Sequence, residues 1–237
     1  MAIPFYLAMT PHQFQNTPRL PRPAAWMGCR FSGSHPGLSD LPEALPPGSL
    51  LMLNDSRPMD GHDHGLILEQ LSHTAEAFLC DGIVLDFQRP WNGQTAALVR
   101  FLSSRLPSPM AVSEIYAKDT DQTIFLSPTP PDVSLSGHLA PWKGRDIWLD
   151  LAPAHRTVIL TESGAQYGPW DEDGHSQGYF RDNLLHTHYR IETGDCLRFP
   201  MFRTTDDLLA MLAEAEEHRV TKAVGLYQEW EKSPGFP

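Results

Sequence analysis

Residues 81–88, with the sequence DGIVLDFQ, place polar side chains at the end of an apolar run, where they could do chemistry. The stretch from Ile83 to Leu85 is typical of a strand that is covered on both faces of a parallel sheet. Asp86 and Gln88 lie two residues apart, so on a strand both side chains point to the same side. Because α/β proteins place their chemistry at the carboxyl ends of parallel strands, we expect Asp86 and Gln88 to open into a binding site.

Further carboxylates lie at the carboxyl ends of other predicted strands: Asp55, Glu114, Asp150 and Glu229. Glycosidases use a pair of carboxyl groups, separated by about 5 Å for retention or about 6.5–9.5 Å for inversion. Strand ends in an α/β protein could supply either distance, and Glu114 is the best candidate for an acid. The alternative is structural, with Glu114 and Asp55 forming salt bridges to Arg57 or Arg89.

Arg57 and Arg89 each stand directly before a proline and shortly after a predicted strand. Two arginines at one site could clamp a carboxylate or phosphate group of a ligand. The alternative is that they neutralise the neighbouring Asp55 and Asp86. Trp91 follows the second of these turns, where its ring could stack against a sugar.

Residues 60–64, DGHDH, contain an H-x-H pair that resembles the first metal ligands of metal-dependent barrel hydrolases. Here the pair opens a predicted helix, where Asp60 or Asp63 would be a natural N-cap. No further histidine stands at the end of a later strand, as a metal site of that kind would need. We therefore expect no metal and no other cofactor, and we keep a hydrolase that uses His62 and His64 as an alternative.

The elements that must position these residues alternate along the chain. Three helices are predicted, over residues 65–78, 94–106 and 205–219, from the spacing of their apolar residues. Eight strands are predicted, over residues 5–9, 25–31, 49–54, 82–88, 110–117, 123–127, 146–151 and 223–228. Strands that alternate with helices favour a parallel sheet, and closed barrels of this class have about 250 residues. We expect one domain over residues 1–237, an irregular (β/α)₈ TIM barrel, with an open doubly wound sheet as the alternative.

Several connections are too short for a regular barrel. The link over residues 11–23 is rich in proline, and residues 38–45 allow only a turn or two of helix. Residues 157–167 predict a β-hairpin inserted after the seventh strand, and residues 171–176 a surface loop. Because outer helices are short or missing, we expect the hairpin or a second copy of the chain in a homo-oligomer to cover the barrel wall.

The composition excludes several classes of partner. The chain has 29 acidic and 18 basic residues, and its formal net charge of −11 argues against nucleic acid or an anionic membrane. The first residues lack the pattern of a signal peptide and no run of about 20 apolar residues is present, so we expect neither a secretory leader nor a membrane span. Three scattered cysteines, Cys29, Cys80 and Cys196, support neither a zinc site nor a disulfide framework. We expect a soluble cytoplasmic protein.

Residues 81–88 resemble the signature of the family 18 glycoside hydrolases, the chitinase-like enzymes, whose fourth barrel strand reads D-G-x-D-x-D-x-E. Asp81, Gly82 and Asp86 match that pattern, whereas Val84 replaces its second Asp and Gln88 its closing Glu. In that family the Glu protonates the leaving glycosidic oxygen, while the neighbouring Asp orients the N-acetyl group that attacks. Gln88 has no proton to release, and loss of a general acid typically lowers the rate by about 10²- to 10⁴-fold.

The resemblance implies a barrel that binds an oligosaccharide or a similar small polar molecule at its mouth and lacks the family's chitinase activity. Whether it is an enzyme stays open, since an active glycosidase with its acid moved to Glu114 or Glu229 is the main alternative. The residues that we expect to take part are Asp86, Gln88 and Glu114 in catalysis, and Asp55, Arg57, Arg89, Trp91, Tyr116, Tyr227 and Glu229 in ligand binding.

Overall fold

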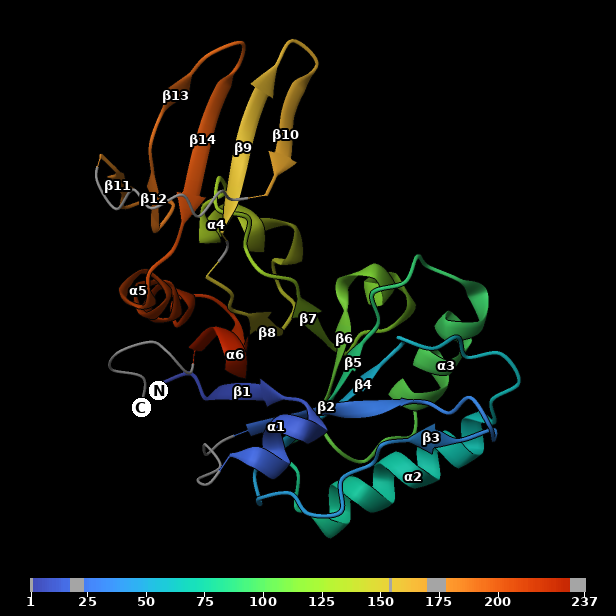
Figure 1. Ribbon diagram of the computed structural model, residues 1–237. Coiled ribbons are helices and arrows are strands. Elements are labelled where there is room, and N and C mark those ends of the chain that lie inside the picture. The colour runs from blue at the N-terminus through green and yellow to red at the C-terminus, as the bar shows by residue number, and fades with distance from the viewer. Residues whose placement is uncertain (1, 18–23, 154, 170–177, 231–237) are drawn as a thin grey trace.

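The computed structural model describes residues 2–17, 24–153, 155–169 and 178–230, and its main sheet is a closed barrel (Figure 1). The parallel strands, in barrel order, are β1 (Phe5–Met9), β2 (Ala24–Phe31), β4 (Leu50–Asn54), β5 (Gly82–Asp86), β6 (Met110–Ser113), β7 (Thr123–Leu126), β8 (Ile147–Asp150) and β15 (Val220–Leu226). Strand β1 pairs in parallel with both β2 and β15, which closes the ring. The prediction of an irregular (β/α)₈ barrel is confirmed, and the open sheet is wrong.

The barrel interior is packed with side chains rather than hollow. Its buried apolar cluster draws on every strand of the ring: Tyr6, Ala8, Ala25, Leu50, Met52, Val84, Ala111, Phe125, Trp148 and Val224. These residues alternate with outward-facing ones because successive side chains of a strand point to opposite faces. The residue two positions after an interior residue points to the same side of its strand. The interior cluster therefore identifies the residues whose side chains point toward the mouth.

Helices cover the outer wall unevenly: α1 (Pro11–Asn16), α2 (His64–Ala77), α3 (Gly93–Ser103), α4 (Leu135–Leu139), α5 (Thr205–Ala215) and α6 (Tyr227–Trp230). The longer ones begin at side chains that cap free backbone N–H groups. Asp63 accepts from the N–H groups of Gly65 and Leu66 at the start of α2, and Asn92 accepts from Thr95 at the start of α3. The three predicted helices are present, and α5 ends at Ala215 rather than at residue 219.

Three segments form a different element from the one predicted, and the predicted fourth strand ends at Asp86 rather than at residue 88. The fifth strand ends at Ser113, and Glu114–Asp119 form a 3₁₀ helix in place of the expected strand extension. The eighth strand ends at Leu226, so Tyr227 begins α6. Within residues 38–45 there is no helix; instead β3 (Leu38–Ser39) pairs antiparallel with the end of β2. Apolar residues in these segments are buried against neighbours from distant parts of the chain, which strand periodicity cannot reveal.

A second sheet is inserted between β8 and α5. It comprises β9 (Arg156–Thr161), β10 (Gly164–Gly168), β11 (Phe180–Asp182), β12 (Thr187–Tyr189), β13 (Glu192–Thr193) and β14 (Leu197–Phe202). The predicted hairpin is confirmed as β9 and β10, whereas the other four strands were not predicted. Figure 1 shows this sheet projecting from the barrel beyond α4 and α5 rather than lying along the barrel wall, so the hairpin does not provide the expected cover. Residues 171–176, predicted as a loop, fall outside the described residues.

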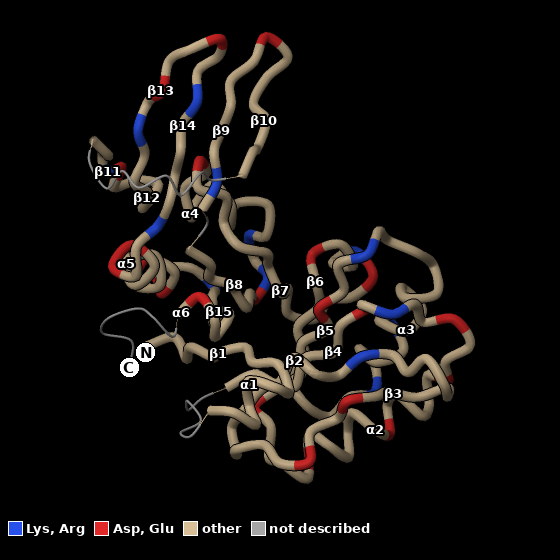
Figure 2. Tube along the Cα trace, in the orientation of Figure 1, with Lys and Arg blue, Asp and Glu red and all other residues tan. Residues whose placement is uncertain are grey.

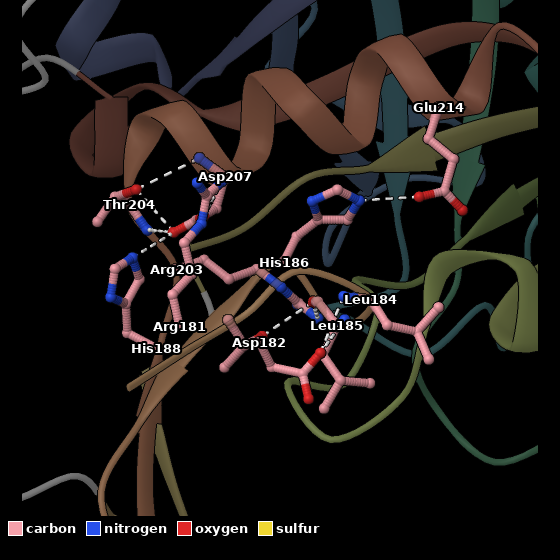
Figure 3. Close-up of polar contacts among 11 residues, drawn as sticks. Arg181, Asp182, Leu184, Leu185, His186, His188, Arg203, Thr204, Asp207 and Glu214 are labelled. Atoms are coloured by element: carbon pink, nitrogen blue, oxygen red, sulfur yellow. Dashed lines mark hydrogen bonds and ion pairs between the residues drawn. The ribbon is translucent and has the colours of Figure 1, made fainter. Parts of the chain in front are cut away.

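Polar contacts join the inserted sheet to α5 (Figure 3). The buried carboxylate of Asp207, in the first turn of α5, contacts Arg181 at 2.9 Å and His188 at 3.2 Å. Hydrogen bonds from Thr204, together with the charges of His188 and Arg181, hold the pKa of Asp207 below its usual range despite its burial. A second contact, His186 to Glu214 at 2.8 Å, lies further along the helix.

Lys and Arg positions are scattered along the backbone in Figure 2, and acidic positions stand at the tips of the inserted sheet and on α5. Among the described residues, no helix combines the length and the apolar character needed to cross a bilayer.

Candidate functional site at the barrel mouth

Asp86 and Gln88 lie together at the carboxyl end of β5. Both continue the inward alternation set by Val84, which belongs to the interior cluster. The Gln88 amide donates a hydrogen bond from Nε2 to Oδ1 of Asp86 at 3.2 Å. Gln88 is exposed, whereas Asp86 is largely buried. The pair therefore presents an amide to solvent with a carboxylate behind it.

Asp55 positions the turn that carries this pair. Its Oδ1 accepts from the backbone N–H of Gln88 at 2.9 Å, and its Oδ2 accepts from that of Arg89 at 3.0 Å. Asp55 itself is buried and follows the neighbouring strand β4. Because each of its oxygens accepts a backbone N–H, Asp55 holds the turn that carries Gln88 and Arg89 in place at the mouth.

Two adjoining hollows open at the mouth, and Asp86 and Gln88 line both. The first, of about 540 Å³, lies over β4 and β5 and is also lined by Met27, Met52, Asn54, Asp55, Ser56, Arg89 and Pro90. The second, of about 300 Å³, lies over β5 to β8 and is also lined by Phe87, Ser113, Glu114, Ile115, Phe125, Ser127, Pro128 and Asp150. The site therefore combines apolar walls with a few convergent polar groups, as small-molecule sites commonly do.

Electrostatics in the second hollow centre on Asp150, the last residue of β8. Burial, and then the negative charges of Asp86 and Glu229, raise the pKa of Asp150 to about 8. Burial also raises the pKa of Asp86, in part offset by the hydrogen bond from Gln88, and burial raises that of Glu229. Carboxyl groups that repel one another at a buried site cannot all be ionised, so Asp150 keeps its proton at neutral pH.

Glu114 and Tyr116 lie on the same 3₁₀ helix, but their side chains have different surroundings. Glu114 lines the second hollow, and its Oε1 accepts a hydrogen bond from the Ser127 hydroxyl at 2.7 Å. Tyr116 is fully buried in the outer core, where its ring meets that of Phe87 edge to face at 5.9 Å. Glu114 thus stands where the sequence predicted, while Tyr116 packs between the barrel and its helices.

Arg57 and Arg89 flank a separate rim hollow of about 260 Å³. Arg89 donates to the backbone oxygen of Ser56 at 2.9 Å. In the described part of the chain, no ion pair joins either arginine to Asp55 or Asp86, so the expected neutralisation does not occur by direct contact. Trp91 is about half exposed, and its Nε1 donates to Asp119 at 2.8 Å.

Tyr227 and Glu229 lie on the short helix α6 after β15. Tyr227 packs against the outer core clusters and lines neither mouth hollow. One oxygen of Glu229, Oε2, is fully buried without a hydrogen-bond partner among the described residues. Glu229 acts on the site through its charge beside Asp150.

The other half of the motif, Asp81 and Gly82, faces the opposite end of the barrel. Asp81 accepts hydrogen bonds from the Tyr6 hydroxyl and the Lys222 ammonium group. Lys222 lies 5.0 Å from the centroid of the Trp148 ring. A methyl group at Gly82 would stand 2.4 Å from Trp148, so the glycine makes room for that indole. Asp81 and Gly82 therefore close the barrel floor.

The histidines of residues 60–64 face the protein. Both ring nitrogens of His62 contact backbone oxygens, Nδ1 that of Met59 at 2.8 Å and Nε2 that of Ser32 at 3.0 Å. His64 packs against the ring of Phe101. Across the described ranges, no group of three or more His, Cys, Asp or Glu side chains is placed to hold a metal ion. The metal-hydrolase alternative gains no support from this geometry.

Asp150 is a site residue that the sequence did not single out. It stood among several acids at strand ends that could supply a catalytic carboxyl group, and Glu114 was preferred among them. Strand alternation could have shown that Asp150 points inward. Asp150 follows Trp148 by two residues, just as Asp86 follows Val84, and both Trp148 and Val84 lie in the barrel interior. What alternation cannot show is that β5 and β8 converge on one hollow.

Solved structures share this fold. A class V chitinase from Nicotiana tobaccum matches with a TM-score of 0.60 and 10% identity, over 95% of this chain and 93% of the chitinase. A glycoside hydrolase family 18 chitinase from Cycas revoluta, solved with (GlcNAc)₃, matches with a TM-score of 0.58 and 11% identity, over 94% of each chain. The spore cortex-lytic enzyme SleL from Bacillus cereus matches with a TM-score of 0.56 and 10% identity, over 99% of this chain and 71% of SleL.

Comparison by sequence gave no match: no protein-family model matches this chain, and no curated protein matches it. At about a tenth identity, the structural matches establish the architecture. The chain has the glycoside-hydrolase-like barrel fold of the family 18 chitinases and SleL.

Proposed function

We propose that the barrel mouth binds a carbohydrate and that it does not act as a chitinase by the family 18 mechanism. The observation that carries the proposal is the hydrogen-bonded pair of Asp86 and Gln88, which lines both hollows at the mouth. A carboxylate and an amide together accept from and donate to sugar hydroxyl groups. The shared fold supports the same class of ligand, since one matching chitinase was solved with (GlcNAc)₃.

The loss of family-type activity follows from the chemistry of Gln88. An amide donates hydrogen bonds but has no proton to transfer near neutral pH. Loss of the acid need not abolish binding. Chitinases from Nicotiana tobaccum and Cycas revoluta, each carrying a Glu-to-Gln substitution, were solved in complex with NAG4 and (GlcNAc)₄ respectively.

The test is a calorimetric titration of the protein with (GlcNAc)₄. We expect binding by the wild type, weakened in Gln88→Ala by about 2- to 13-fold, as expected for a lost hydrogen bond of about 0.5–1.5 kcal/mol. Gln15→Ala, which changes an exposed glutamine on α1, is the matched control and should bind like the wild type. Wild-type protein that takes up no (GlcNAc)₄, or equal affinity in all three, would contradict the proposal.

A glycosidase with a relocated acid is the second candidate. It is favoured by the second hollow, where Asp86, Glu114 and Asp150 line one space. Among the acids expected from the sequence, Glu114 lines that hollow directly. Glu114→Gln should then lower cleavage of (GlcNAc)₄ by about 10²- to 10⁴-fold if Glu114 is the acid, and Glu229→Gln should do so if Glu229 is.

A further inference from the structure

Asp150 occupies a distinctive place in the second hollow. It ends β8, while Asp86 ends β5, so the two carboxyl groups enter the hollow from different strands of the ring. Among the residues that the structure describes, no Lys or Arg lines this hollow, and Phe87, Phe125 and Ile115 supply apolar walls. A carboxyl group in such surroundings has no cation to favour its ionised form.

The neighbouring acids have different roles. Glu114 accepts a hydrogen bond from Ser127, and Asp86 accepts one from Gln88, which favours the ionised form of Asp86 and offsets part of the rise in its pKa that burial causes. Glu229 has its Oε2 buried without a partner among the described residues, beside Asp150. Asp150 is the group whose proton is retained, because its pKa lies near 8. When the environments of two acids push their pKa values apart, one becomes the acid and the other the base.

We propose that Asp150 is the general acid, and Asp86 the general base, of a glycoside hydrolysis in the second hollow. The inference rests on the proposed carbohydrate binding and assigns to Asp150 the proton donation that Gln88 cannot perform. It differs from the relocated acids expected from the sequence, because neither Glu114 nor Glu229 supplies the proton.

The step is balanced with water as the second reactant. Asp150 gives its proton to the glycosidic oxygen while the bond from that oxygen to the anomeric carbon breaks, and the leaving sugar departs as an alcohol. Water forms the new bond to the anomeric carbon and passes its proton to the Asp86 carboxylate. Transfer of that proton through solvent to Asp150 restores both groups.

The experiment compares two probes in the wild type, Asp150→Asn and the matched control Asp121→Asn. Asp121 is exposed and precedes β7, on the far side of the barrel from the mouth. The probes are (GlcNAc)₄, whose leaving alcohol needs protonation, and a p-nitrophenyl glycoside of GlcNAc, whose leaving phenolate needs little. We expect Asp150→Asn to lower cleavage of (GlcNAc)₄ by about 10²- to 10⁴-fold and to lower cleavage of the aryl glycoside far less. A purely structural role would lower both equally.

Binding of (GlcNAc)₄, followed by calorimetry, separates the two proposals. Wild-type protein that binds (GlcNAc)₄ without cleaving either probe, or Asp150→Asn that cleaves both at wild-type rates, overturns the role of Asp150 and leaves the binding function standing. Wild-type protein that neither binds nor cleaves overturns both. If Asp150→Asn does not fold, the wild-type pH profile decides: kcat/KM must fall above about pH 8, and a rate that stays constant there overturns the inference.

Discussion

Residues 81–88 contribute to both ends of the barrel. A strand of five residues, Gly82–Asp86, spans the ring, so Asp81 and Gly82 meet Lys222 and Trp148 at the floor while Asp86 and Gln88 open at the mouth. The match at Asp81 and Gly82 therefore concerns packing at the floor, whereas Asp86 and Gln88 concern the chemistry of the mouth. Gln88, where this chain departs from the family pattern, lies at the mouth and takes no part in the packing of the floor.

Gly82 offers a test of this division. Gly82→Ala should lower the free energy of unfolding by about 1–3 kcal/mol, because its methyl group would overlap the buried Trp148 ring. Gly93→Ala, at the first residue of α3 with no atom within 4 Å of the added carbon, is the control and should be neutral or slightly stabilising. Denaturant unfolding measures both, and equal stability of the two variants would contradict the packing argument.

The inserted sheet is held to the barrel by polar groups at its base. Arg203, which follows β14, is buried and donates to the backbone oxygens of Thr129, Pro130 and Leu185. Two of these oxygens belong to the segment after β7, and the third belongs to the insertion itself. One guanidinium group thus links the sheet to the barrel.

Arg203→Met keeps the volume of the side chain and removes these donors. We expect a loss of about 1–3 kcal/mol for the buried oxygens left without partners, together with faster amide hydrogen exchange in β12 and β14. Exchange in β4 and β5 should not change. Arg198→Met, at an exposed position of β14, is the control. Unchanged exchange in β12 and β14 of Arg203→Met would show that the sheet is held by other contacts.

The folding stability of the whole molecule depends on pH through two aspartates with opposite effects. Asp207 has a lowered pKa in the folded protein. Its contribution to stability is therefore present above the ordinary pKa of an aspartate and is lost as pH falls through the folded pKa. Asp150 has a pKa raised from 3.8 to about 8, so the folded protein binds a proton that the unfolded chain has released across that interval. Asp150 therefore lowers stability as pH rises from about 4 to about 8.

Asp150→Asn removes only the loss of stability with rising pH that Asp150 causes. We expect its Tm to exceed that of the wild type by more at about pH 9 than at about pH 4, because asparagine does not ionise. The control Asp121→Asn should follow the wild-type curve at both ends. A constant Tm difference between Asp150→Asn and the wild type across this range would mean that Asp150 does not titrate as inferred.

The sequence by itself determined the eight barrel strands, the three longer helices and the shared direction of Asp86 and Gln88, because strand alternation and helix spacing are local properties. Alternation also contained the inward direction of Asp150. The tertiary structure alone decided which strand ends share a hollow, since closure of the ring brings Asp86 and Asp150 together from residues far apart in the chain. It also decided that Tyr116 is buried and that the insertion is a sheet of six strands, because such short strands are stabilised by pairing with distant partners rather than by their own pattern.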